Sequence, residues 1–281
     1  MLQRGGGMAE ELKNGIYVSF DGREAGWDMP TFHYHDFYEI YYLCSGTRRY
    51  VVDNTIYDMK AGDIIIIDKN ELHITKNIMK NSGYQRYLLY FTEDALCTLG
   101  DNSSLFMRVF TNRVISLGKE KLKRIDYIFQ GLLKSYNTAD AFSAQLLANG
   151  TYELCTMIYD AVKNDENEAR KFFSNNIDKA LVYLNENFRE NVSLDTVSKI
   201  CNMNKSYFSR CFRKITGIGF SKYLTALRIK EAGRLLANTD MPIGEIAEKS
   251  GFESQQHFCY IFKKETGRRA GEYRFQKRNL L

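Results

Sequence analysis

The chain has 281 residues, enough for two domains that each bury a core of their own. Its composition, with 44% hydrophobic and 26% charged residues, is that of a globular protein and excludes a chain that is disordered throughout. The sequence contains no apolar run of about 18 residues and no hydrophobic leader, so we expect a cytoplasmic protein without a membrane span.

The net charge of +5 is unevenly distributed along the sequence. Residues 177–281 contain 19 Lys and Arg against 11 Asp and Glu, a net charge of +8, whereas residues 1–176 carry a net charge of −3. An acidic front joined to a basic back indicates that only the C-terminal part meets a polyanion.

Residues 16 to about 92 predict a β-rich domain. Short β-branched and aromatic runs are separated by Gly, Asn, Asp and Lys turns; the runs are IYVSF, FYEIYYL, RRYVVD, TIYDM, DIIIID and YQRYLLYF. Many short strands at close spacing are typical of an all-β barrel or sandwich. We therefore assign residues 1–92 to an N-terminal β-barrel.

One stretch of this domain, HYHDFYEIYYLCSG, places three potential ligands at alternating positions of a predicted strand. Because successive side chains alternate between the faces of a strand, one face carries six of them. They are His33, His35, Phe37, Glu39, Tyr41 and Leu43. His73 follows on a later predicted strand. Three imidazoles and a carboxylate suit a divalent ion such as Zn, Ni, Fe, Mn or Cu, and the spacing does not choose among them.

After Thr92 the pattern changes to a helical period. The segments KEKLKRIDYIFQGLLKSY and DAFSAQLLANGTYELCTMIYDAV predict two long helices. Residues 93–163 then form either a dimer interface or a cover over one end of the barrel. The polar stretch KNDENEARKFFSNN breaks both periodicities, so we assign residues 164–176 to a linker.

Residues 177–281 contain an internal repeat. VSLDTVSKICNMNKSYFSRCFRKITG and MPIGEIAEKSGFESQQHFCYIFKKETG each predict a helix, a short polar turn and a second helix that ends in Thr-Gly. Two helices joined by a tight turn are the helix-turn-helix pattern. The pairs Phe208/Phe212 and Phe258/Phe262 give both second helices the same buried face.

The opposite face of each second helix carries groups that can contact DNA. Arginine suits guanine, glutamine suits adenine, and lysine or serine typically contacts the backbone. The candidates are Lys205, Ser206, Ser209, Arg210 and Arg213, then Gln255, Gln256, His257, Tyr260 and Lys263. For any one residue an ordinary solvated face is the alternative, but two repeated units in a basic domain argue against it for the set.

These motifs resemble the DNA-binding domain of the AraC family of bacterial transcription regulators. The resemblance lies in IAEKSGFESQQHFCYIFKKETG with the following EYR, in YFSRCFRKITG and in the linking helix FSKYLTALRIKEAGRLL. It implies two helix-turn-helix units whose recognition helices enter successive major-groove segments. The base readers that it implies are Ser206, Ser209, Arg210, Gln256, His257 and Tyr260. Ala270 stands where the family usually has proline, which is expected to loosen the start of the last helix.

The N-terminal domain resembles the cupin family. The signature G-x5-H-x-H-x3,4-E-x6-G is matched with one extra residue after Gly26, and G-x5-P-x-G-x2-H-x3-N is matched with Asp68 and Asn70 in place of proline and glycine. The matching positions are Gly26, His33, His35, Glu39, Gly46, Gly62, His73 and Asn77. Cupin enzymes use this ligand set for dioxygenase or isomerase chemistry. In cupin-like sensors of the regulator family, the resemblance implies a small effector, often a sugar, bound without catalysis and often without metal.

The candidate effector-binding residues combine these ligands with polar and aromatic groups on neighbouring strands. They are His33, His35, Glu39, Tyr41, Arg48, Tyr50 and His73. One of the adjacent arginines, Arg48 or Arg49, should face inward, and Tyr90 could complete the pocket. Aromatic walls with a few convergent polar groups suit a sugar or a small aromatic acid.

The sequence thus predicts an α+β multidomain protein, with a cupin-like β-barrel, a helical dimerisation segment and an all-α domain of two helix-turn-helix units. The predicted function is effector-controlled regulation of transcription, without enzymatic activity, as an activator or a repressor. The expected partners are double-stranded promoter DNA, a small effector and a second copy of the chain. The alternatives are a metal-responsive regulator that binds a divalent transition metal through His33, His35, Glu39 and His73, and a cupin metalloenzyme tethered to DNA.

Overall fold

The structure is a computed structural model. It describes residues 12–23, 29, 32–79, 82–95, 114–138, 142–164 and 176–278. Gly26 of the first cupin signature and residues 165–175 of the predicted linker lie outside the described residues.

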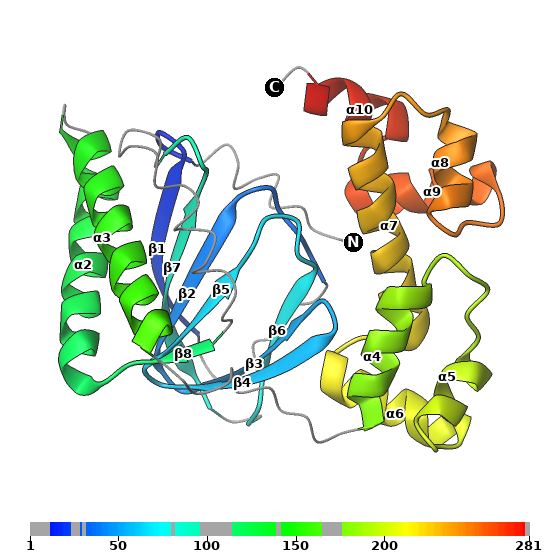
Figure 1. The fold of residues 1–281 in the computed structure, drawn as a ribbon, viewed down its shortest axis with the longest axis horizontal. Helices are drawn as coiled ribbons and strands as arrows, with labels where there is room; N and C mark the ends of the chain where they lie inside the picture. The colour runs from blue at the N-terminus through cyan, green and yellow to red at the C-terminus, as the bar shows by residue number, and fades with distance from the viewer. Residues whose placement is uncertain are drawn as a thin grey trace.

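The N-terminal domain is a two-sheet β-structure, as the strand-like runs predicted (Figure 1). Its strands are β1 (Ile16–Arg23), β2 (Tyr38–Ser45), β3 (Thr47–Val52), β4 (Thr55–Lys60), β5 (Asp63–Ile67), β6 (His73–Asn77), β7 (Tyr84–Phe91) and β8 (Val114–Ser116). One sheet has the order β1-β7-β2-β5-β8 and the other has the order β4-β3-β6. All the pairings within the two sheets are antiparallel.

Strand β2 is buried on both faces, which explains its nearly continuous apolar sequence. Tyr41 and Leu43 point into the barrel interior, where Tyr50 of β3 and Leu88 of β7 pack with them. Its alternate residues, such as Ile40, instead pack with helices outside the sheet. The strand therefore positions a side chain of the candidate site, Glu39, on the interior side.

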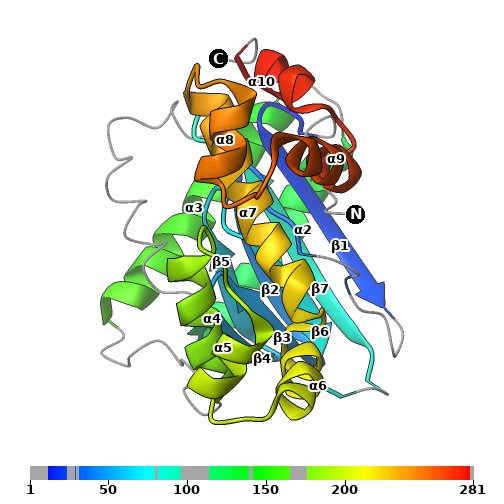
Figure 2. The same ribbon diagram turned by 90° about the vertical axis from the view of Figure 1, so that its right-hand side faces the viewer.

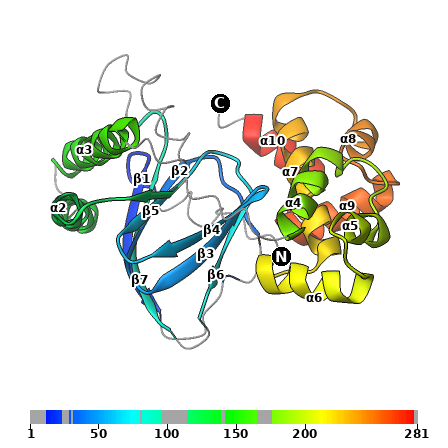
Figure 3. The same ribbon diagram turned by 60° about the horizontal axis from the view of Figure 1, so that its bottom comes forward.

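Two helices, α2 (Lys119–Asn137) and α3 (Ser143–Asn164), confirm the helical period after Thr92. Ile125 and Phe129 of α2 and Leu154 of α3 share a core with the outer face of the five-stranded sheet. Figure 3 shows this helix pair on the opposite side of the barrel from the remaining helices. The pair thus covers a sheet face rather than an end of the barrel.

The C-terminal domain is all-helical, as the internal repeat predicted. Its helices are α4 (Asn176–Asn187), α5 (Leu194–Ile200), α6 (Lys205–Thr216), α7 (Phe220–Asn238), α8 (Ile243–Lys249), α9 (Gln255–Thr266) and α10 (Ala270–Arg278). The pairs α5–α6 and α8–α9 are the two helix-turn-helix units, and α7 joins them (Figure 2). Among the described residues, no helix is long and apolar enough to cross a bilayer.

Side-chain caps fix where the helices of the two units begin. The Ser193 hydroxyl accepts a hydrogen bond from the backbone at the start of α5, and Asn204 and Ser254 do the same for α6 and α9. Both α6 and α9 end at a glycine in the left-handed region, Gly217 at φ 79° and Gly267 at φ 76°. These equivalent ends give the two repeats recognition helices of the same length.

The last helix starts at Ala270 although proline is absent there. The Ala270 side chain is buried, and the Glu272 carboxylate accepts a hydrogen bond from the Arg269 backbone N–H at 2.9 Å. This contact satisfies one of the otherwise unpaired amide groups at the helix start. The expected loosening of the helix start is therefore offset by the packing of the Ala270 side chain and by this hydrogen bond.

The helical domain packs on the barrel through α4 and α7 (Figures 1 and 2). Phe32 and Leu72 of the barrel share one apolar core with α4 and α7, and the rings of Phe32 and Tyr223 meet edge to face at 5.2 Å. Polar contacts accompany this core: Lys230 pairs with Asp53 at 2.8 Å, and the Tyr223 hydroxyl donates to the Asp53 carbonyl oxygen.

Candidate functional site

The turns before the two recognition helices have equivalent backbone geometry. Asn202 and Gly251 both adopt the left-handed region, at φ 52° and φ 83°. At Gly251 an added Cβ would lie 2.7 Å from the Arg189 Cα, so this turn also requires glycine for its close approach to the segment that follows α4. The first unit tolerates asparagine because Asn is among the few residues that adopt this conformation readily.

The buried and exposed faces of α6 and α9 are those expected from the sequence. Phe208, Phe212, Phe258 and Phe262 are fully buried. The candidate DNA-binding residues are exposed except Ser209, which is partly exposed; the exposed set is Lys205, Ser206, Arg210, Arg213, Gln255, Gln256, His257, Tyr260 and Lys263. Figure 2 shows α6 and α9, like the rest of the helical domain, in front of the barrel.

One residue of this face was missed from the sequence. Tyr207 is exposed on α6, and its backbone N–H is capped by the Asn204 side chain at 2.9 Å. It lies three residues before Arg210, on the same side of the helix. The three-residue spacing from Arg210 is the feature of the sequence from which Tyr207 could have been predicted to share this face. Lys205 also has a protein partner, since its ammonium lies 3.0 Å from the Asp195 carboxylate of α5.

The three predicted histidines and Glu39 converge at one point of the barrel. Their candidate ligand atoms all lie within 4.8 Å of one another. The backbones of His33 and His73 exchange hydrogen bonds at 3.0 and 2.9 Å. His35, Glu39 and His73 are 5%, 3% and 1% exposed, respectively, while His33 is partly exposed as a residue although its imidazole lies buried in the cluster.

The predicted strand over residues 33–37 is wrong, because β2 begins only at Tyr38. The His35 backbone carbonyl accepts from the Asn70 N–H at 2.6 Å, and the His35 ring bonds the Phe37 carbonyl at 2.8 Å. These contacts hold the chain in a turn instead of a ladder. His35 therefore reaches the cluster from outside a strand, whereas Glu39 lies on β2, His73 begins β6, and His33 forms an isolated antiparallel bridge with His73.

The hydrogen bonds of the imidazoles define what the cluster can hold. The Nδ1 atoms of His35 and His73 each lie 2.8 Å from a backbone carbonyl oxygen, of Phe37 and Glu71, so both Nδ1 atoms carry a proton. Their Nε2 atoms face the same oxygen of Glu39, at 3.0 and 3.3 Å. An unprotonated Nε2 atom and a carboxylate oxygen can each accept a hydrogen bond but cannot donate one. Each contact thus requires a proton on Nε2 or a cation between the groups.

The pKa directions follow from burial and from this mutual contact. Burial alone would raise the pKa of Glu39, but hydrogen bonds from His35 and His73 hold that pKa well below its usual value. Burial would lower the pKa of His73, yet the Glu39 carboxylate 3.3 Å from its Nε2 raises it. Burial and the neighbouring His73 lower the pKa of His33 well below the usual value, which favours the neutral form of its imidazole.

The remaining candidate effector residues lie in the same barrel interior. Tyr41 and Tyr50 are buried, and the Tyr50 hydroxyl donates to Glu39 at 3.4 Å. Arg48 is the inward arginine: its guanidinium donates to Thr75 at 3.1 Å and stacks over the Tyr84 ring at 4.1 Å.

The adjacent arginine points the other way, because Arg49 pairs with Asp58 on the opposite side of the small sheet at 2.5 Å. A further basic residue of the interior, Arg86, was not predicted; it lies 5.3 Å from the Tyr41 ring centre. Its signal was strand alternation, since Arg86, Leu88 and Tyr90 are two residues apart on β7.

Two family models match the chain where these two sites lie. A model described as the AraC-like ligand binding domain matches residues 17–151, and one described as a helix-turn-helix domain matches residues 197–276. The molecule is therefore a DNA-binding transcription regulator with an N-terminal ligand-binding domain. The chain belongs to the AraC family. Both matching domains and the relatives given below are those of transcription regulators, as the sequence predicted.

Relatives from bacteria match over most of their length. The chain is 26% identical over 260 residues to an uncharacterised HTH-type transcriptional regulator, YdiP of Escherichia coli, covering 89% of this chain and 82% of that one. It is 22% identical over 236 residues to the HTH-type transcriptional activator RhaS of Enterobacter sp., covering 83% of both chains. Among solved structures, an apo ToxT variant of Vibrio cholerae is 15% identical, with a TM-score of 0.40, over 94% of this chain and 98% of that one.

Proposed function

We propose that this regulator binds a small organic effector inside the barrel and contacts promoter DNA with α6 and α9. The support is the set of buried polar groups that share the barrel interior with aromatic walls, above all the fully buried Arg48 and Glu39. Burying a charged group costs free energy unless the group is paired, either within the protein or with a ligand. The effector class that we infer is a sugar or a small aromatic acid. The proposed effector residues are His33, His35, Glu39, Tyr41, Arg48, Tyr50 and His73.

The proposed DNA-contacting residues are the ten candidates of α6 and α9 named above. The proposed division of the chain is a sensing barrel over 1–92, a helical segment over 93–163, a linker over 164–176 and a DNA-binding domain over 177–281. We further propose that two copies associate through α2 and α3, so that two DNA-binding domains reach adjacent half-sites.

A thermal-unfolding screen tests the effector proposal. Sugars and small aromatic acids are added to the full chain and to an Arg48→Met variant, which removes the buried guanidinium but keeps an unbranched apolar side chain. An effector should raise the melting temperature of the parent and leave the variant unchanged. An Arg49→Met variant is the matched control, because Arg49 points away from the interior. A compound that stabilises Arg48→Met as much as the parent would contradict binding at this site.

The alternative of a metal-responsive regulator is favoured by one observation. Two Nε2 atoms with fixed Nδ1 protons face one carboxylate oxygen, and an ion of the borderline divalent class fits that donor set. A bound ion would act as the signal, and the protein ligands would be His33, His35, Glu39 and His73. The test is the metal content of untagged protein beside a His33→Ala, His73→Ala double variant, followed by DNA affinity with and without chelator. Near-stoichiometric metal in the parent alone supports this alternative. A parent protein that takes up none of Zn, Ni, Fe, Mn and Cu contradicts it.

A further inference from the structure

Arg86 of β7 lies on the interior face of the barrel, and its guanidinium has no hydrogen bond to any residue that the structure describes. Its ion-pair partner is the Asp21 carboxylate of β1, whose oxygen lies 3.7 Å from the guanidinium nitrogen and so beyond hydrogen-bond distance. The side chain is 15% exposed, so little of it is open to water. Arginine is permanently charged and has five N–H donors. The barrel therefore holds a largely buried cation that still needs hydrogen-bond acceptors.

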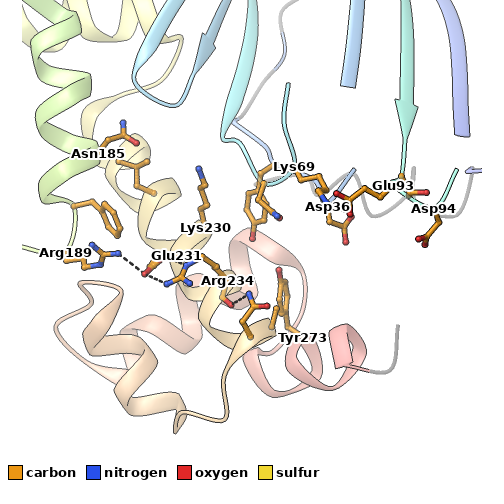
Figure 4. Close-up of a pocket in the computed structure, with 18 residues that line it drawn as sticks. Asp36, Lys69, Glu93, Asp94, Asn185, Arg189, Lys230, Glu231, Arg234 and Tyr273 are labelled. Atoms are coloured by element: carbon orange, nitrogen blue, oxygen red, sulfur yellow. Dashed lines mark hydrogen bonds and ion pairs between the residues drawn. The ribbon is translucent and has the colours of Figure 1, made fainter. Parts of the chain in front are cut away.

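Three arginines elsewhere in the described chain differ in this respect. In the cavity between the barrel and the helical domain, Arg189 and Arg234 share the Glu231 carboxylate at 2.8 Å (Figure 4). On the small sheet, Arg49 holds Asp58 through two nitrogens, at 2.5 and 2.6 Å. These guanidinium groups already bind carboxylates of the chain at hydrogen-bond distance, whereas the one on β7 does not.

The Tyr41 hydroxyl is a second donor in the same place. The Arg86 guanidinium lies 5.3 Å from the centre of the Tyr41 ring, and the hydroxyl lies within the electrostatic reach of that charge. Tyr41 is 2% exposed, and its hydroxyl has no hydrogen-bond partner among the described residues. A buried hydroxyl without a partner costs free energy. Two neighbouring donors that lack acceptors are complementary to a ligand that brings acceptors.

The Glu39 carboxylate of the same interior does not serve as this acceptor. It lies opposite Tyr90, four residues along β7 from Arg86, which corresponds to about 13 Å of strand. Its oxygens are held instead by the His35 ring at 3.0 Å and by the Tyr50 hydroxyl at 3.4 Å. Glu39 therefore leaves the guanidinium on β7 without an acceptor.

We propose that Arg86 and Tyr41 bind the carboxylate of the effector, so that the effector is an aromatic carboxylic acid and not a neutral sugar. This inference rests on the proposed binding of an effector in the barrel and narrows its chemical class. A carboxylate accepts two parallel hydrogen bonds from one guanidinium because the two planar groups match in spacing. Its remaining lone pairs accept the Tyr41 hydroxyl. A neutral sugar leaves the buried charge of Arg86 uncompensated.

The apolar walls of the interior select the rest of the ligand. Leu43 of β2 and Leu88 and Tyr84 of β7 belong to the same buried cluster, next to Arg86 along the two paired strands. Such walls favour a flat apolar body. A phosphate ester carries more charge than a carboxylate, so its desolvation costs more in these surroundings. The ligand class is thus a monocarboxylate with an aromatic body, such as a benzoate, a phenylacetate or a cinnamate.

Isothermal titration calorimetry of the full-length protein tests the inference with benzoate, phenylacetate, cinnamate and their hydroxylated derivatives. Each acid is titrated beside its primary amide, which has nearly the same shape but no charge, and neutral hexoses and pentoses are titrated in parallel. We expect at least one acid to bind, and we expect its amide to bind at least about tenfold more weakly.

Two variants locate the carboxylate. Arg86→Met removes the guanidinium and keeps an unbranched apolar side chain, so acid and amide should bind it within about twofold of each other. Tyr41→Phe removes only the hydroxyl and should weaken binding of the acid at least about tenfold, and it decides the question alone if Arg86→Met does not fold. Arg49→Met is the matched control and should keep the preference of the parent for the acid, because Arg49 pairs with Asp58 outside the interior.

The inference is overturned if no acid binds the parent, if the amides bind as well as the acids, or if either variant keeps the affinity of the parent for the acid. Its failure differs from a failure of the proposed function. A neutral sugar that binds the parent but not Arg48→Met would keep the barrel as the effector site and reject the carboxylate. If neither an acid nor a sugar binds, both proposals are wrong.

Discussion

At the scale of single residues, Glu231 of α7 shows how neighbouring arginines lower the pKa of a carboxyl group. Its carboxylate accepts from Arg234 at 2.8 and 3.0 Å and pairs with Arg189 at 2.8 Å. The hydrogen bond from Arg234 and then that from Arg189 lower the pKa of Glu231 to about 2 against the effect of its burial. Because α4 ends at Asn187, this carboxylate ties the segment after α4 to the middle of α7.

A Glu231→Gln variant should lose stability that depends on pH. The folded-state pKa is lowered, so the ionised carboxylate stabilises the protein above its unfolded pKa near 4.5, and this contribution is lost as pH falls toward about 2. Allowing for solvent screening, we expect a cost of about 1 kcal/mol near neutrality. Urea unfolding of parent and variant at about pH 6 and about pH 3 measures it. A difference that stays constant between those two pH values would contradict the assignment.

The alternation of side chains along a strand predicted that one of two neighbouring residues faces the barrel interior, but not which of the two. The pair Arg48 and Arg49 had to place one guanidinium on each face of β3, but the sequence could not set the phase of that strand. The register did so: Arg49 lies opposite Asp58 on β4, and their ion pair holds it outside. The convergence of His73 with His35 depends on sheet packing between segments that are far apart in the chain, which no local period encodes.

At the scale of elements, the recognition helices were predictable because their pattern is local. An apolar pair four residues apart, a capping side chain and a terminal glycine fix the start, the end and the buried face of α6 and of α9. The start of β2 and the three-residue β8 were not predictable. The first depends on backbone hydrogen bonds to a distant loop, and β8 is too short to show a period.

Two substitutions on these helices test base reading element by element. Arg210→Ala and Gln256→Ala should each cost about 1–3 kcal/mol at a DNA site selected by the parent from a random library, and less on random DNA. The reason is that each removes a side chain that can make two hydrogen bonds to one base. Fluorescence anisotropy at fixed salt gives both affinities. Lys264→Ala, at the end of α9, is the control, since a phosphate contact loses equally on both DNAs.

At the scale of the whole molecule, the exposed face of the α2–α3 pair bears on the oligomeric state. Tyr127 is 67% exposed and Leu146 is 52% exposed on these helices. A Tyr127→Glu, Leu146→Glu variant should weaken self-association at least about tenfold if this face is the dimer interface. Sedimentation equilibrium measures it, with Gln130→Glu on the same helix as the control for added charge. Equal association of the parent and the double variant would place the interface elsewhere.

One contact joins the histidine cluster to the DNA-binding domain. Asp53, at φ 45° in the turn between β3 and β4, donates its N–H to the Leu72 carbonyl at 2.7 Å, and its carboxylate accepts the Leu72 N–H at 3.1 Å. The same residue binds Lys230 and Tyr223 of α7. Leu72 directly precedes His73 of the cluster. We therefore predict that a shift of β6 at the cluster reaches α7 through this turn.

Amide exchange tests this coupling without knowledge of the effector. Since linkage between two sites is reciprocal, DNA bound at α6 and α9 should change the exchange rates around Asp53 and Leu72 in the parent. A Tyr223→Phe, Lys230→Met variant, saturated with the same selected DNA, should lose that response because both contacts of α7 with Asp53 are gone. Lys222→Met, on the same helix, is the control and should keep it. A response that persists in the double variant would mean that the domains communicate by another route, through the apolar contact of Phe32 with α7 rather than through Asp53.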